Sequence, residues 1–143
     1  MLPTAQEVGR LWFEVVWNRG RRGAIAELLS PNVVLHDAGE DSVGIDPFLL
    51  FFDRMHDTFS DIHVDVEEIL GVYDRACIRW TCKAKHTGFG LSVPPTGGEV
   101  RFTGLSIIHV EDGKVVEAWQ NWDMLGMKEQ IKRHSAPHTY ITA

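Results

Sequence analysis

The second half of the chain alternates apolar and polar residues in long runs, the pattern of β-strands with one buried face. Asp112-Gly113 lies between two of these runs and is a strong hairpin signal. Near Glu67 the alternation slips, which predicts a β-bulge. Strands this long curve, so the pattern predicts a concave antiparallel sheet. The four long strands are expected at residues 62–72, 76–87, 100–110 and 114–123.

The first half of the chain has apolar residues at helical spacing. The first helix is expected to begin at Thr4, an N-cap with Glu7 at capping-box spacing, and to end near Asn18. The third helix is expected to begin at Asp46-Pro47, with proline at its first position. Between them the pattern predicts a short helix at 24–29, a short strand at 33–37 and a polar loop at 39–44.

After the hairpin, Asp123 can cap a last short helix at residues 124–132. Helices that precede a run of antiparallel strands favour an α+β fold. We therefore expect a cone-shaped, curved antiparallel sheet with three N-terminal helices packed over its concave face. No repeat or linker divides the chain, so residues 1–143 are expected to form a single domain, with a loose tail from about residue 133.

Composition and charge limit the kinds of binding partner that the chain can have. The chain is 44% hydrophobic and 24% charged, as in ordinary globular proteins. A net charge of −6 argues against a nucleic-acid partner, which would need a basic face. No apolar run is long enough to span a membrane, and no signal peptide is evident, so we expect a cytoplasmic protein without a membrane partner. No motif predicts a metal or a bound cofactor.

Several stretches of the second half resemble one known family. The segments GLSVPPTGGEVRFTG, VEDGKVVEAWQNWD and LGMKEQI look like the SnoaL-like polyketide cyclase family, within the nuclear-transport-factor-2-like superfamily. The resemblance implies a cavity between helices and concave sheet, a small hydrophobic ligand, and a homodimer through the outer sheet face. It also implies an acid–base pair on the hairpin strands, an Asp on the last strand and a His on the one before. Gln120 and Ser106 stand at those two positions, so the chain departs from the family at both.

The residues themselves suggest other proton-transfer groups. Gln120 cannot be a general base, but it can polarise an oxygen; alternatively it satisfies neighbours in a semi-polar core. His36 is the leading candidate for proton transfer, because the family pattern places its strand at the cavity and its pKa lies near working pH. The alternative is a histidine bound to the cavity rim. His86 is the second candidate, or an exposed bystander at a strand end. Asp37, opposite in phase to His36, is set aside.

Large apolar residues are expected to shape the pocket, although core packing is the more frequent fate of such side chains. They are Trp80, Phe102, Trp122, Phe52 and Met55, and His86 is expected to line the pocket with them.

Two functions from different classes remain. The first is a cofactor-independent acid–base enzyme acting on a small lipophilic carbonyl or cyclic substrate, with His36, Gln120 and Ser106 at its centre. The second is a non-catalytic binding protein for a small apolar ligand. An epoxide-hydrolase-like reaction ranks last, because Arg79 and Arg101 are expected to point away from the cavity.

Overall fold

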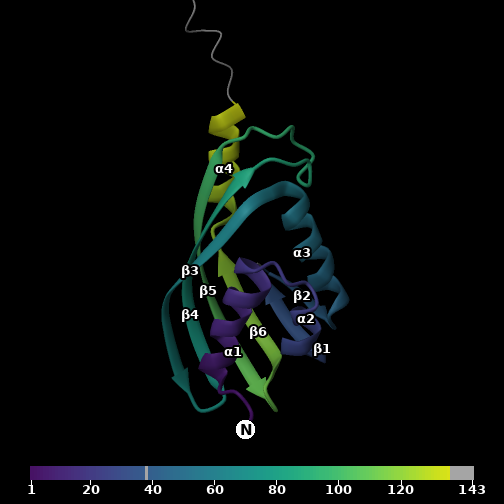
Figure 1. The fold of residues 1–143 in the computed structure, drawn as a ribbon, viewed down its shortest axis with the longest axis vertical. Coiled ribbons are helices and arrows are strands. Elements are labelled where there is room, and N and C mark those ends of the chain that lie inside the picture. Colours follow the sequence, from purple (N-terminus) through teal and green to yellow (C-terminus); the bar gives the residue numbers. More distant parts are fainter. Residues whose placement is uncertain (38, 136–143) are drawn as a thin grey trace, which may run out of the picture.

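The computed structural model describes residues 1–37 and 39–135, and within them six strands form one curved, open sheet (Figure 1). The strand order across the sheet is β2-β1-β6-β5-β4-β3. Every neighbouring pair is antiparallel except β1 and β6, which run parallel. The strands are β1 (Leu29–Asp37), β2 (Glu40–Val43), β3 (Phe59–Val72), β4 (Arg75–His86), β5 (Glu99–Glu111) and β6 (Lys114–Trp122).

The helices begin where the chemistry of their first residues predicts. The Thr4 hydroxyl accepts a hydrogen bond from the Glu7 backbone N–H (3.1 Å), and the Glu7 carboxylate accepts one from the Thr4 N–H (3.2 Å), so the capping box is formed. The first helix changes at Trp12 from an α-helix to the wider π form. The helices are α1 (Ala5–Leu11), η1 (Trp12–Asn18), α2 (Ala24–Leu28), α3 (Asp46–Thr58) and α4 (Met124–Ser135).

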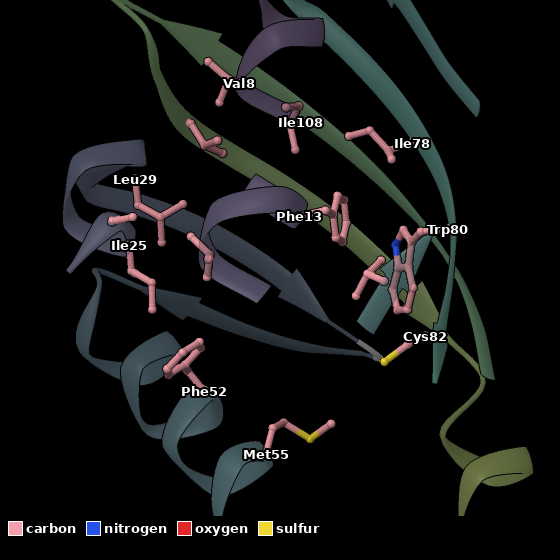
Figure 2. Close-up of a cluster of buried hydrophobic side chains, with 14 of the residues drawn as sticks. Val8, Phe13, Ile25, Leu29, Phe52, Met55, Ile78, Trp80, Cys82 and Ile108 are labelled. Atoms are coloured by element: carbon pink, nitrogen blue, oxygen red, sulfur yellow. The ribbon is translucent and has the colours of Figure 1, made fainter. Parts of the chain in front are cut away.

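One hydrophobic core joins the helices to the sheet (Figure 2). Val8 and Ile25 from the helices are fully buried, as is Ile78 on β4. Along β5 buried residues alternate with exposed ones or, at His109, with a half-buried one, so one face of the sheet packs on the core and the other faces solvent. The predicted α+β cone is confirmed.

Two expectations for the first half are wrong. Residues 39–44 were expected to be a polar loop, but Glu40–Val43 form β2, which pairs with the end of β1. The sheet is mixed rather than purely antiparallel, because β1 pairs in parallel with β6. Strand β2 is a short edge strand and mostly exposed, so it carries no apolar alternation that would distinguish it from a loop.

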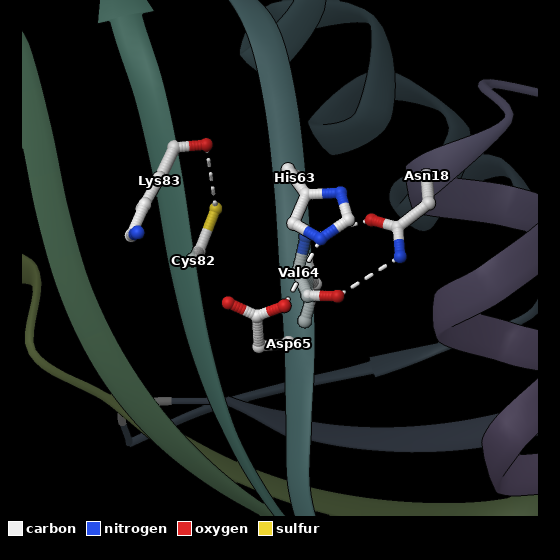
Figure 3. A network of polar contacts seen from close by, with 6 residues as sticks. All are labelled: Asn18, His63, Val64, Asp65, Cys82 and Lys83. Carbon is white, nitrogen blue, oxygen red and sulfur yellow. Dashed lines mark hydrogen bonds and ion pairs between the residues drawn. The ribbon is translucent and has the colours of Figure 1, made fainter.

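The other edge strand, β3, is partly covered by a side chain (Figure 3). The Asn18 carboxamide accepts a hydrogen bond from the Val64 N–H (2.6 Å) and donates one to the Val64 carbonyl (2.9 Å). It thereby satisfies backbone groups where the pairing of β3 with β4 shifts register between Ser60 and His63. The predicted bulge at Glu67 is also present, as a second register shift between Val66 and Glu68.

The end of the chain packs back on the sheet. The Asp123 carboxylate accepts a hydrogen bond from the Gly126 N–H (2.8 Å) at the start of α4, and Met127 and Ile131 are buried. The loose tail was predicted from about residue 133, whereas α4 continues through Ser135; residues 136–143 lie outside the described part. Of the helices described, none is long and apolar enough to cross a lipid bilayer.

Candidate functional site

A cavity of about 550 Å³ lies between the helices and the concave face of the sheet. Its wall is largely apolar, and residues from nearly every element contribute to it. This volume is in the range of small-molecule sites. The apolar wall includes Trp12, Phe13, Leu35, Phe51, Met55, Leu91, Ile108, Trp122 and Met127.

A smaller pocket of about 40 Å³ lies beside this cavity and shares Gln120 and Trp122 with it. Trp80 and Phe102, both predicted pocket residues, line this extension. Cys82 lines it too, and burial raises the pKa of its thiol to about 12. The thiol therefore stays protonated at neutral pH and forms part of the wall rather than a nucleophile.

A chain of hydrogen bonds crosses the sheet beneath the cavity. The Trp80 indole N–H donates to the Ser106 hydroxyl (3.1 Å), and this hydroxyl donates to the Gln120 carbonyl oxygen Oε1 (3.2 Å). The three residues lie on adjacent strands, β4, β5 and β6. The structure thus brings Ser106 and Gln120 together, and both line the cavity.

Asp37, set aside by sequence reasoning, also lines the cavity. It pairs in register with Gln120 across β1 and β6, and residues paired in this way point to the same face of a sheet. Its Oδ1 is buried, as is the indole nitrogen of Trp122, and neither atom has a hydrogen-bond partner among the described residues. Burial raises the pKa of Asp37. The nearby Trp122 N–H, although it does not reach hydrogen-bond geometry, lowers this pKa, and the charge of Glu40 raises it.

His36 borders the cavity as well, but both of its ring nitrogens are occupied. Nδ1 lies 2.7 Å from an Asp41 carboxylate oxygen and Nε2 lies 2.7 Å from one of Glu117. These hydrogen bonds raise the pKa of His36, the one to Glu117 most. The ring stacks on Trp119, its register partner on β6, and consecutive residues Trp119 and Gln120 point to opposite faces of the sheet. His36 and Gln120 therefore point to opposite faces of the sheet, and the assignment of proton transfer to His36 stays a prediction.

The remaining predicted pocket residues divide into two groups. Met55 and Trp122 line the cavity, whereas Phe52 and His86 line neither the cavity nor the smaller pocket beside it. Phe52 packs on Trp17, with ring centroids 5.2 Å apart. His86 is fully buried rather than exposed, and its Nδ1 accepts the Thr96 N–H (3.3 Å). Its role is to hold the loop between β4 and β5.

Sequence reasoning missed Asp37 and Phe51 as cavity residues. Phe51 is adjacent to Phe52 on α3, and periodicity alone did not distinguish the two. For Asp37 a signal existed, because Val33 and Leu35 share its phase along β1 and both pack into the core.

A cone of helices over a curved, open sheet, with a largely apolar cavity between them, is the architecture of the nuclear-transport-factor-2-like fold. The family profile of SnoaL-like polyketide cyclases matches residues 7–131. The chain belongs to the SnoaL-like polyketide cyclase family.

Solved structures support the same fold. A putative SnoaL-like polyketide cyclase from Jannaschia sp. CCS1 is 22% identical, with 92% of each chain covered and a TM-score of 0.80. IdmH, a putative polyketide cyclase from Streptomyces antibioticus, is 24% identical over 91% of this chain and 99% of its own, with a TM-score of 0.81. AclR, a putative hydroxylase from Streptomyces galilaeus, is 25% identical over 97% and 90%, with a TM-score of 0.80. No curated protein shows significant sequence similarity to the chain.

Proposed function

We propose that this protein is a cofactor-independent acid–base enzyme acting on a small lipophilic carbonyl or cyclic substrate. The observation that carries the proposal is the pairing of Asp37 with Gln120 in the cavity wall: a carboxyl group with a buried oxygen beside a side-chain amide. Sites of this kind combine a proton-transfer group with a group that stabilises charge on oxygen. Family membership supports small-molecule chemistry without fixing the reaction.

The proposed step is enolisation. The Asp37 carboxylate takes a proton from the carbon next to the substrate carbonyl, and the electron pair of the C–H bond moves to form the enolate. Gln120 donates an N–H to the oxygen on which negative charge develops. The protonated Asp37 then returns the proton to carbon, at the same or another position. Burial of Asp37 supports this role, because a raised pKa makes its carboxylate a stronger base and its acid a donor nearer neutral pH.

The test is hydrogen exchange in a simple ketone, 2-tetralone, followed by NMR in D₂O. The protein should accelerate exchange at the carbons next to the carbonyl above the buffer rate. Asp37→Asn should reduce the acceleration on the order of 10²-fold, the usual scale for a general base. Asp65→Asn is the matched control, an equally conservative change at an exposed carboxylate on β3 that lines neither cavity. Exchange at the buffer rate with wild-type protein would count against the proposal.

His36→Ala separates the two candidate bases. If His36 transfers the proton, this variant should lose exchange while Asp37→Asn retains it. If Asp37 transfers the proton, the pattern reverses. Circular dichroism of both variants checks that the fold is intact. Unchanged exchange in His36→Ala would remove His36 from the mechanism.

A second candidate is a non-catalytic binding protein for a small apolar ligand. It is favoured by the replacement of the family's usual Asp and His by Gln120 and Ser106 and by the largely apolar wall. Affinity for tetralin, a hydrocarbon of similar size, would then be insensitive to changes at His36 and Gln120. It would fall when Trp80 is shortened to leucine, because the lost contact area would not be replaced.

We also propose that two copies associate through the outer face of the sheet. Leu105 and Ile107 project from the central strand β5 and are 50% and 43% exposed. Cys77 and Trp119 flank Ile107 on the neighbouring strands, which extends the apolar strip. Sedimentation analysis should give a dimer for the wild type and a monomer for Ile107→Lys. A monomeric wild type at micromolar concentration would refute this association.

A further inference from the structure

We infer that Trp80 and Ser106 fix the orientation of the Gln120 amide, so that the site selects ligands with a hydrogen-bond-accepting oxygen such as a ketone. The inference rests on the proposed cavity site and adds to it a specificity device and a substrate class. In it Trp80 and Ser106 are positioning residues. They need not touch the ligand.

The argument starts from the indole, which can only donate a hydrogen bond. The Trp80 N–H points at the Ser106 oxygen, 3.1 Å away, so that oxygen acts as an acceptor there. The Ser106 proton is then free for another partner, and Gln120 Oε1 lies 3.2 Å from the Ser106 oxygen. Since the carbonyl end of the amide accepts this proton, the NH₂ end is the one left to meet a ligand.

The opposite orientation of the amide is unfavourable. It would place the Gln120 NH₂ against a hydroxyl whose own proton would then lose its acceptor. Trp80 and Ser106 are 5% and 6% exposed, so water has little access to replace that acceptor. An unsatisfied buried polar group costs enough to bias the two orientations on the order of tenfold or more.

The Trp80 ring also has little freedom to turn away. It lies over Gly104, where a side chain as small as methyl would meet ring carbon Cζ2 at 2.1 Å. Phe13 and Phe102 pack on the ring, with centroids 5.7 and 6.3 Å away. The indole N–H is therefore held in place by packing rather than by its hydrogen bond alone.

The chemistry of the ligand follows from this polarity. An N–H donor beside the Asp37 carboxyl fits a neutral compound with a carbonyl oxygen. Hydrocarbons of the same shape lack the acceptor. Alcohols and amines can still bind, but the hydrogen bonds that they donate find no acceptor at an N–H group.

The test compares two ligands that differ by one oxygen. The dissociation constants of 2-tetralone and tetralin are measured by isothermal titration calorimetry. The wild type should prefer the ketone by roughly five- to tenfold, the value of one hydrogen bond. Equal affinities, or no binding of either compound, would overturn the inference.

Variants then show whether the preference comes from the hydrogen-bond chain of Trp80, Ser106 and Gln120. Ser106→Ala should bring the ketone preference close to one, because the amide can turn. Trp80→Phe should reduce it by less, because the Ser106 hydroxyl keeps its bond to Gln120. Thr103→Ala, an exposed position on the same strand, is the control and should keep the wild-type ratio. A purely structural role would weaken both ligands equally and leave the ratio unchanged, which would overturn the inference.

Failure of this inference is distinguishable from failure of the proposed function. Ligand preference is measured as a ratio of dissociation constants and exchange is measured as a rate, so the two outcomes are independent of one another in the wild-type protein. A protein that prefers the ketone but shows no hydrogen exchange would have an oriented Gln120 amide without the proposed enzymatic activity. The indole N–H resonance of Trp80, assigned by its absence in Trp80→Phe, gives an independent check. It should move upfield in Ser106→Ala, and an unmoved resonance would contradict the hydrogen bond.

Discussion

Replacing Gly104 by alanine tests how the sheet positions the site. The added methyl group would lie 2.1 Å from Cζ2 of Trp80 and 2.5 Å from Cε2, whereas ordinary contact begins at 3.4 Å. The difference between 3.4 and 2.1 Å means that the ring must retreat by about 1.3 Å. The indole N–H is already 3.1 Å from the Ser106 hydroxyl, so a shift of that size would break the hydrogen bond.

The expected cost has two parts. Overpacking of a filled core costs about 1–3 kcal/mol. Loss of a buried hydrogen bond adds about 1 kcal/mol. Gly104 does not lie at positive φ, so backbone strain adds nothing to this sum. We expect the free energy of unfolding to fall by about 2–4 kcal/mol in Gly104→Ala.

Urea unfolding followed by fluorescence measures this change, and Gly23→Ala is the matched control. A methyl group at Gly23 meets no atom within 4 Å, and its φ is −63°. The control should stay within about 0.5 kcal/mol of the wild type. The ketone preference should fall in Gly104→Ala and persist in the control. A Gly104→Ala protein as stable as the control, with unchanged preference, would refute the placement of the Trp80 ring.

Three further predictions concern stability. Asp41 and Glu117 hold the pKa of His36 above about 6.5, the reference value for histidine. The wild type should therefore be more stable than His36→Gln below pH about 6.5, and this difference in stability should shrink as the pH rises through the raised pKa. A difference in the free energy of urea unfolding that stays constant with pH would contradict the prediction. Burial raises the pKa of Asp37 in the folded protein. The wild type should therefore lose stability relative to Asp37→Asn as the pH rises from about 4, the pKa in the unfolded chain, through the raised pKa of the folded state. A wild type that gains stability relative to the variant over this range would argue against burial of the Asp37 carboxyl. Thr4→Ala removes the capping box and should cost about 1 kcal/mol in thermal unfolding, with no effect on ligand binding.

Local signals made most of the fold predictable. Asp112 and Gly113 adopt positive φ (51° and 77°), as a tight hairpin turn requires, and Asp-Gly is the sequence that favours it. The capping box at Thr4 and the bulge at Glu67 are equally local. The inward phase of Trp80 on β4 followed from alternation alone. Each of these features depends on a few consecutive residues, which is why one sequence sufficed.

The site was harder to predict, because its central pairing is not local. Alternation showed that His36 and Asp37 point to opposite faces, but it did not show which one faces the cavity. That depends on the parallel pairing of β1 with β6, which joins residues more than 80 positions apart and sets Asp37 beside Gln120. Val33 and Leu35 could have decided this, because they are apolar and alternate residues of a strand share a face. If they face the core, Asp37 faces the same way. The polar β2 gave no pattern at all, although its Asp41 holds the His36 ring.

The resemblance sets Gln120 and Ser106 where the family carries an Asp and a His, and this assignment bears on the pH dependence of the proposed reaction. Neither side chain ionises near neutral pH. Under the proposed mechanism the charge state of Asp37, the base, controls exchange. As a base it must be ionised, and exchange should rise with pH through its raised pKa and then level off. A second limb falling at higher pH would require an essential acid. His36, with its raised pKa, would be the first residue to suspect, and its substitution by glutamine should abolish that limb. A single rising limb that disappears in Asp37→Asn would assign the proton transfer to Asp37 alone.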